Sequence, residues 1–211
     1  NNYKLEIEDN LKELINLASV SSSLIVLPEA ELPYTYKSAN FKNFESDINT
    51  DQTIIGGVWH ISEGNLYNSM VNFQSQQIYN KVHLVPFGEY IPFISSLRGL
   101  ISFFDMPMSD VIKGKSNQKP MLFDTQSLKK MAPLICFDIA FGNTVRKSNI
   151  SSLFMVNISN DTWFGKSIGP YQHLDIARVR SIENNKWMIR ATNDGFSALI
   201  DNNGTIVDKL E

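Results

Sequence analysis

The stretch Pro133-Leu134-Ile135-Cys136-Phe137-Asp138-Ile139-Ala140-Phe141 brings the only cysteine of this 211-residue chain to the end of an apolar run. The residues before the cysteine are typical of the end of a buried strand, and those after it can start a helix. A sulfur at a helix N-terminus is favoured as the thiolate, because the helix dipole and free N–H groups stabilise negative charge. Cys136 is therefore a candidate nucleophile, although a free cysteine is also commonly a small buried hydrophobe.

Charged residues follow two other apolar runs of the chain. Glu29 comes after the run LIVLP, and Lys81 comes after the run IYN. A glutamate can take the thiol proton as general base, a lysine can stabilise an oxyanion, and a cysteine can carry an acyl group. Glu29, Lys81 and Cys136 therefore form a chemically complete candidate catalytic set.

The order glutamate, lysine, cysteine resembles the nitrilase, or carbon–nitrogen hydrolase, superfamily. Four segments resemble more specifically the catalytic domain of the bacterial apolipoprotein N-acyltransferase family: LPEAELPY, NKVHLVPFGEYIPF, ICFDIAF and the stretch from NISNDTWFG to ATNDGFSALID. By this resemblance Glu29 is the base, Lys81 the triad lysine and Cys136 the acylated cysteine. Glu89 matches a further carboxylate near the reacting centre, and Asp138 is an additional active-site candidate.

The chain departs from the pattern of that family in two places. After the cysteine the family usually has Tyr-Glu, whereas this chain has Phe137 and Asp138, so a hydroxyl is lost and a carboxylate is shortened. The family also has a transmembrane bundle and a first strand before the position of Asn1, and further sheet after Glu211. We therefore expect residues 1–211 to form a single nitrilase-like catalytic domain that lacks parts at both ends.

The composition favours one globular domain and gives no sign of nucleic-acid binding. The chain is 43% hydrophobic, carries a formal net charge of −3 and has no cluster of basic residues. It has no run of about 18 apolar residues, so any membrane anchor is expected outside it. His60 and His83 have no acidic or cysteine partner at metal spacing, so neither a metal nor a cofactor is expected.

Strand and helix signals along the chain indicate an α/β protein. Helices are expected over residues 4–18 and 169–183, and a long loop is expected over residues 30–51. Strands are expected over residues 24–29, 53–59, 66–73, 77–84, 121–123, 151–158, 187–191, 196–200 and 205–210. This order is typical of a layered α/β fold. The resemblance implies the more definite form, a four-layer α-β-β-α sandwich.

One apolar segment, residues 90–108, is open to two interpretations. It has only two charged residues, and its large side chains include Phe93, Phe103 and Phe104. The segment can be a helix tucked against the core or an arm that faces lipid or an acyl chain, since an apolar run of this size must be covered. We favour the arm, because the segment directly follows Glu89, where the resemblance places the reacting ester.

Trp163 and Phe164 lie in a second segment of interest, residues 157–165, which is rich in turn formers and bulky rings. Turn formers indicate a loop at the end of the preceding strand. Aromatic rings on such a loop are suited to shaping the wall of a pocket rather than to performing chemistry. We therefore expect Trp163 and Phe164 to lie beside the substrate.

The activity that the resemblance implies is acyl transfer through a cysteine thioester. The Cys136 thiolate would attack an ester carbonyl of a phospholipid, and the N-terminal amine of a diacylglyceryl-cysteine apolipoprotein would then take the acyl chain. These partners imply the extracytoplasmic, periplasmic face of the bacterial inner membrane. Two alternatives stay open: a soluble amidase of the same superfamily that hydrolyses a small amide with the same triad, and a catalytically silent binding domain on the same fold.

Overall fold

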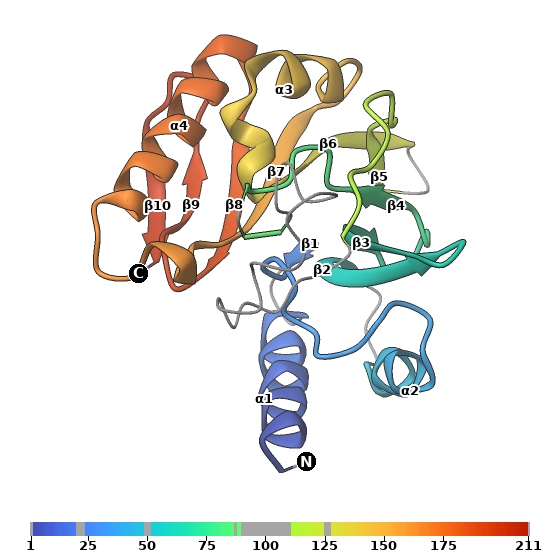
Figure 1. Ribbon diagram of the computed structural model, residues 1–211. Helices are drawn as coiled ribbons and strands as arrows, with labels where there is room; N and C mark the ends of the chain where they lie inside the picture. The colour runs from blue at the N-terminus through green and yellow to red at the C-terminus, as the bar shows by residue number, and fades with distance from the viewer. Residues whose placement is uncertain are drawn as a thin grey trace, which may run out of the picture.

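Two β-sheets form the centre of the computed structural model, which describes residues 2–19, 24–48, 52–86, 88–89, 111–124 and 128–210 (Figure 1). The first sheet has the order β1-β2-β3-β4, with β1 (Leu24–Val26), β2 (Thr53–Ser62), β3 (Asn65–Asn72) and β4 (Ile78–Asn80). The second has the order β10-β9-β8-β7-β6-β5, with β5 (Met121–Asp124), β6 (Lys129–Ile135), β7 (Phe154–Asn160), β8 (Met188–Asn193), β9 (Ser197–Ile200) and β10 (Ile206–Leu210).

Parallel strands lie side by side in both sheets. β1 pairs with β2 in parallel, and β6, β7 and β8 form a parallel group in the second sheet. The remaining pairs are antiparallel, including the hairpins β8–β9 and β9–β10. Because parallel strands end at the same edge of a sheet, the residues that follow β6, β7 and β8 are brought together there.

Four helices cover the outer faces of the two sheets in the described part of the chain (Figure 1). The helices α1 (Asn2–Ser19) and α2 (Ala39–Asp47) pack on the first sheet, and α3 (Gly142–Ser148) and α4 (Gly169–Asn184) pack on the second. A third apolar cluster, which includes Ile55, Met70, Met131 and Ile135, lies between the sheets. The layers are therefore α-β-β-α, which confirms the expected four-layer sandwich.

The alternation of side chains along a strand explains how both sheets bury two faces. On β2, Ile54 packs toward the helices and the next residue, Ile55, packs between the sheets. On β6, Leu134 packs toward the helices and Ile135 packs between the sheets. Since successive side chains point to opposite faces, a strand covered on both sides must be apolar at nearly every position.

The expectation of a structureless loop over residues 30–51 is wrong, because this segment contains α2. The Ser38 hydroxyl accepts a hydrogen bond from the Phe41 N–H at 3.2 Å and so caps the helix N-terminus. Phe41 and Phe44 are three residues apart, lie on one helix face and are buried in the apolar cluster between the helices and the first sheet. The capping serine and this aromatic pair are the sequence signals for the helix.

The predicted helix over residues 169–183 is confirmed by α4, which has Pro170 in its first turn and is followed by the left-handed residue Asn185.

Among the described residues, no helix combines the length and the apolarity needed to cross a membrane. Phe93, Phe103 and Phe104 lie outside the described residues, so the lipid-facing arm stays a prediction.

Gly57 on β2 allows the backbone that carries Glu29 to approach the sheet closely. A Cβ atom at Gly57 would lie 2.5 Å from the Ala30 nitrogen and 2.6 Å from the Glu29 Cα. The Gly57 N–H also donates a hydrogen bond to the Pro28 carbonyl at 3.1 Å. Any side chain at this position would therefore push the segment of Glu29 away from the sheet.

We predict that Gly57→Ala lowers the free energy of unfolding by about 1–3 kcal/mol, the usual range for overpacking. The matched control is Gly56→Ala, whose Cβ would meet only side-chain atoms of Leu27 and Phe73, at 3.3 Å or more, and which should cost less. Urea denaturation of both variants tests this expectation. Equal losses of stability would contradict the close approach as the reason for glycine at position 57.

Candidate active site

Glu29, Lys81 and Cys136 meet at one cavity, and each of them follows a strand. Glu29 comes three residues after β1, while Lys81 and Cys136 directly follow β4 and β6. The cavity has a volume of about 300 Å³. Its lining consists of Glu29, Ala30, Trp59, Asn68, Lys81, Val85, Gly88, Glu89, Cys136, Asn160 and Trp163. The structure thus brings the three candidate catalytic residues together with Glu89 and Trp163.

Lys81 lies between two carboxylates in the floor of this cavity. Its Nζ atom is 2.8 Å from Glu29 Oε1 and 3.0 Å from Glu89 Oε1, and the residue is only 2% exposed. Burial favours the neutral amine, but the negative charges near Lys81, with Glu29 first among them, outweigh it and raise its pKa. Lys81 is therefore an ammonium ion that is held in place from two sides.

Asn68, in the middle of β3, completes the hydrogen bonding of the two carboxylates. Its Nδ2 atom donates to Glu29 Oε1 at 2.6 Å and to Glu89 Oε1 at 2.9 Å. The second oxygen of Glu29 accepts a hydrogen bond from the Asn160 backbone N–H at 2.8 Å. Sequence reasoning missed Asn68 and Asn160, because β3 and β7 each carry several polar residues and neither asparagine stands out in the pattern.

Cys136 occupies a sharp turn between β6 and the short 3₁₀ helix η2 (Cys136–Ala140). Its φ angle is +44°, in the left-handed region, which costs a residue other than glycine about 1–2 kcal/mol. Burial and the negative charge of Glu29 raise the pKa of the thiol to about 12, although Lys81 and the neighbouring Ser159 act in the opposite direction. The expected stabilisation of a thiolate at this turn is therefore wrong, because the resting thiol is neutral.

Asp138 connects the segment that follows Lys81 with the turn at Cys136 by hydrogen bonds. One oxygen accepts hydrogen bonds from the backbone N–H groups of Val82 and His83 at 3.2 and 2.8 Å. The other accepts from the Ile135 N–H and the Tyr79 hydroxyl, both at 3.2 Å. Burial raises the pKa of Asp138 to about 6, although these donors and Lys81 lower it. Asp138 does not line the cavity, so we interpret it as a residue that aligns Lys81 with Cys136.

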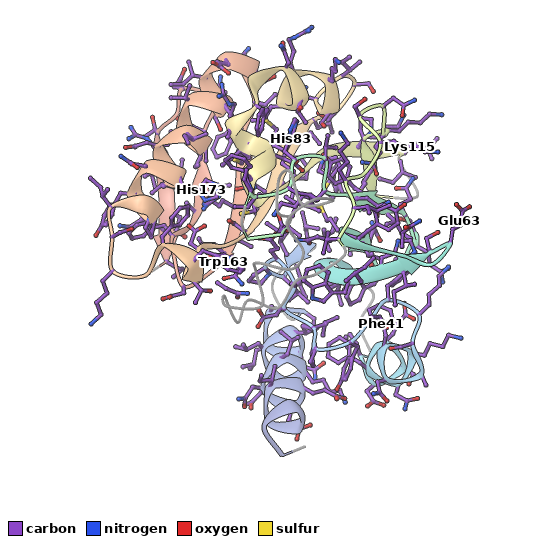
Figure 2. The ribbon with its side chains drawn as sticks, in the orientation of Figure 1. Phe41, Glu63, His83, Lys115, Trp163 and His173 are labelled. Carbon is purple, nitrogen blue, oxygen red and sulfur yellow. The ribbon has the colours of Figure 1, made fainter. Side chains whose placement is uncertain are left out.

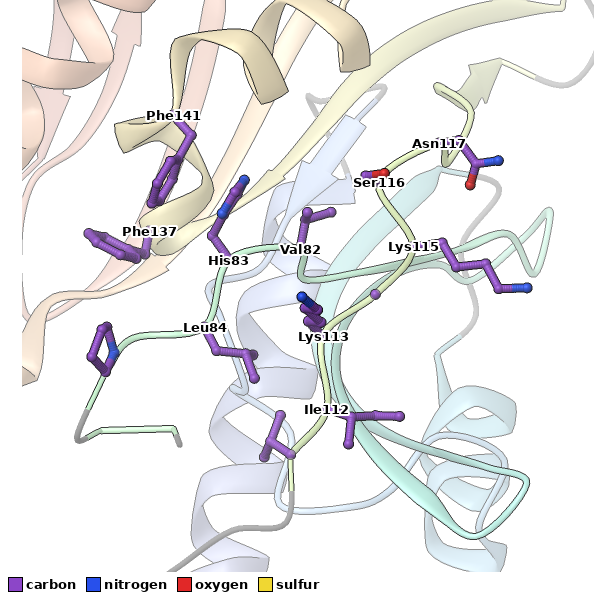
Figure 3. A pocket seen from close by; sticks show the side chains of 13 residues that line it. Val82, His83, Leu84, Ile112, Lys113, Lys115, Ser116, Asn117, Phe137 and Phe141 are labelled. Carbon is purple, nitrogen blue, oxygen red and sulfur yellow. The ribbon is translucent and has the colours of Figure 1, made fainter. Parts of the chain in front are cut away.

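Phe137 faces a second and larger cavity rather than the catalytic one. This cavity has a volume of about 1240 Å³ and an apolar lining that includes Phe137, Phe141, Val82 and Leu84. Figure 3 shows the two phenylalanines on one side of it, with His83 next to them. The ring of His83 stacks on Phe141 with 3.7 Å between the centroids, so His83 is a packing residue at this cavity. The hydroxyl lost at Phe137 therefore lies away from the described catalytic residues.

Trp163 and Phe164, on the 3₁₀ helix η3 (Asp161–Phe164), have different surroundings. Trp163, labelled in Figure 2, lines the catalytic cavity and is 70% exposed. Phe164 is not among the lining residues; its ring packs against the ring of His173, with 5.8 Å between centroids. Of these two residues, only Trp163 therefore contributes to the wall of the catalytic cavity in the described structure.

Among the described residues, no three histidine, cysteine, aspartate or glutamate side chains lie close enough together to hold a metal ion. In the cavity, Lys81 lies between Glu29 and Glu89 and pairs with both carboxylates.

The fold and the cavity define a nitrilase-type enzyme domain. The structure matches an amidase from Nesterenkonia sp. with a TM-score of 0.65 and 15% identity, over 98% of this chain and 80% of that one. It matches Saccharomyces cerevisiae Nit3, a member of branch 10 of the nitrilase superfamily, with a TM-score of 0.70 and 20% identity over the same shares. The sequence model of the carbon–nitrogen hydrolase family matches residues 2–211, and the chain therefore belongs to this family.

More similar sequences are found among bacterial acyltransferases. The chain is 41% identical over 201 residues to the apolipoprotein N-acyltransferase of Pseudomonas syringae pv. tomato, which covers 91% of this chain and 39% of that protein. It is 36% identical over 203 residues to the apolipoprotein N-acyltransferase of Nitrosomonas europaea, with 90% and 39% covered. The chain thus spans about two fifths of the length of these curated relatives.

We predict that Glu29→Gln lowers the pH at which the Cys136 thiol ionises, because it removes the neighbouring charge that raises the thiol pKa most. The matched control is Glu89→Gln, which removes the same charge from a position with a smaller influence on the thiol and should shift its ionisation less. Ultraviolet absorbance of the thiolate, with Cys136→Ser as the blank, measures both shifts. A larger shift in Glu89→Gln would contradict the assignment of Glu29 as the nearest base.

Proposed function

We propose that this chain is the catalytic part of an N-acyltransferase. It moves a fatty acyl chain from a phospholipid, through a thioester on Cys136, to the N-terminal amine of a diacylglyceryl-cysteine apolipoprotein. The observation that carries the proposal is a complete buried Glu29–Lys81–Cys136 site in a chain 41% identical to an apolipoprotein N-acyltransferase over 91% of its length.

The first half-reaction forms the acyl-enzyme. Since the thiol is neutral at rest, its proton passes to the Glu29 carboxylate as the sulfur attacks the ester carbonyl. The carbonyl oxygen becomes an oxyanion beside Lys81, whose ammonium has three N–H donors and two carboxylate neighbours, so one donor can reach it. The ester C–O bond then breaks, and Glu29 returns the proton to the departing lysophospholipid.

The second half-reaction transfers the acyl group. The acceptor amine attacks the thioester carbon, and Glu29 takes a proton from the nitrogen as the new amide bond forms. The C–S bond breaks, and the proton held by Glu29 returns to the Cys136 sulfur. Lys81 stabilises the oxyanion in both halves, because the same carbonyl oxygen is charged each time.

A lipid substrate is supported by an exposed aromatic side chain in the cavity lining. Trp163, which lines the cavity, is 70% exposed. Tryptophan is favoured at membrane interfaces because one end of its ring is apolar and the other is polar. The proposal therefore includes contact with the extracytoplasmic, periplasmic face of the bacterial inner membrane, where both lipid substrates are accessible.

The test is the covalent state of Cys136. After the purified protein is mixed with vesicles of phosphatidylethanolamine and phosphatidylglycerol, mass spectrometry should find an acyl adduct on Cys136. Addition of a diacylglyceryl-cysteine lipopeptide should discharge the adduct and produce an N-acylated lipopeptide. Hydrolysis of small amides without transfer to the lipopeptide would indicate an amidase instead, and absence of any adduct would contradict the proposal.

Two variants separate the roles within this experiment. Cys136→Ser should form no thioester, because serine is nearly isosteric but far less ionisable. Lys81→Met should slow formation of the adduct by about 10²–10³-fold, the usual effect of losing one oxyanion donor. If Lys81→Met accumulated the adduct at the rate of the unsubstituted protein, Lys81 would not be the oxyanion donor.

A further inference from the structure

A second buried charged cluster lies directly behind Cys136. It consists of Asp161, His173 and Arg190, which are 1%, 6% and 2% exposed. Asp161 accepts hydrogen bonds from His173 Nδ1 and from Arg190 Nη2, both at 2.8 Å. Ser159 donates its hydroxyl to the same carboxylate at 2.8 Å. The proposed acyl-transfer steps use none of these side chains.

The cluster contacts Cys136 through His173. The Nε2 atom of His173 lies 3.4 Å from the Cys136 carbonyl oxygen. This contact acts on the residue whose backbone adopts the left-handed conformation with φ of +44°. The cluster is therefore placed to hold this unusual turn in position.

The chemistry of the partners fixes the direction of the hydrogen bonds. The Asp161 pKa is lowered because His173 and Arg190 outweigh its burial, so its carboxylate is an acceptor and His173 Nδ1 donates to it. Arg190 Nη2 also lies 3.1 Å from Nδ1, but Asp161 Oδ2 is its nearer partner at 2.8 Å. The Cys136 carbonyl can only accept, so Nε2 is the donor on that side, and a ring that donates from both nitrogens at once is an imidazolium ion, whose charge the Asp161 carboxylate balances.

The surroundings of the cluster are shaped around these groups. A Cβ at Gly195 would lie only 2.6 Å from Asp161 Oδ2, so glycine leaves room for the carboxylate at this position. Phe164 covers the ring of His173, with 5.8 Å between the two ring centroids. Arg190 is anchored from its other side by the side-chain oxygen of Asn157. The position of the His173 ring is thus fixed on three sides.

We propose that His173 is a positioning residue, which holds the Cys136 carbonyl from its Nε2 atom and so keeps the turn in the conformation that presents the thiol to Glu29 and the cavity. Asp161 and Arg190 act through His173 by fixing its ring. This role rests on the proposed function only in that Cys136 is the nucleophile. It does not depend on which acyl donor or acceptor is used.

Two substitutions of His173 separate the contacts of its two ring nitrogens. In His173→Gln the side-chain amide nitrogen can take the place of Nε2 and still donate to the Cys136 carbonyl. In His173→Asn the shorter amide can take the place of Nδ1 and still meet Asp161, but it cannot reach the carbonyl. Because both replacements are polar amides, any general loss of packing should be similar in the two variants.

The readout is the burst of p-nitrophenol released when the purified protein is acylated by p-nitrophenyl butyrate. His173→Asn should slow the burst by about 10²-fold, as expected for a misplaced reacting group, and His173→Gln should stay within about tenfold of the unsubstituted protein. The ester concentration that gives half the maximal rate should not change. The matched control is the same pair of substitutions at His60 on β2, which packs beside Tyr36 and should leave the burst unchanged.

Equal burst rates in His173→Gln and His173→Asn would overturn the proposal, whether both variants are active or both inactive. Thermal melting of both variants shows whether they are folded to the same extent. Absence of a burst in the unsubstituted protein would contradict Cys136 as nucleophile, and with it both this role and the proposed function. A normal burst without N-acylation of a lipopeptide would contradict the proposed function alone.

Discussion

The buried Lys81 ammonium, held between Glu29 and Glu89, is the constraint on which the rest of the site depends. The three groups come from different parts of the chain, and Asn68 on β3 donates to both carboxylates. A buried charge left without its partner costs several kcal/mol, so the first sheet must assemble all of these groups together. Burial and the charge of Glu29 keep the thiol protonated at rest, so the proposed attack by sulfur needs a base, the role proposed for Glu29.

The second sheet completes the site by holding the proposed base and the proposed nucleophile in register. The end of β7 contributes the Asn160 N–H to a Glu29 oxygen at 2.8 Å and the Ser159 carbonyl to the Glu29 N–H at 3.4 Å. The end of β6 contributes the strained turn of Cys136. Catalysis at this site therefore requires the whole sandwich, because Glu29 and Lys81 come from one sheet and Cys136 from the other.

Sequence reasoning reached the residues that end apolar runs and missed those that act across the fold. Glu29, Lys81 and Cys136 each follow a strand, and the resemblance to a known family supplied the four-layer architecture. Asn68 and His173 could not be found in this way, because their partners Glu29 and Cys136 are 39 and 37 residues away in the chain. The thiol pKa was predicted in the wrong direction, because the sequence indicates a helix start but shows neither burial nor the charge of Glu29.

The central claim is that Lys81 and Glu29 are energetically coupled within one buried charge network. A double-mutant cycle of Lys81→Met and Glu29→Gln, followed by urea denaturation, measures this coupling directly. Lys81→Met alone should cost about 3–5 kcal/mol, because it leaves buried carboxylates unpaired. The double variant should lose less than the sum of the single losses, by about 0.5–3 kcal/mol. Losses that add within about 0.5 kcal/mol would contradict the coupling.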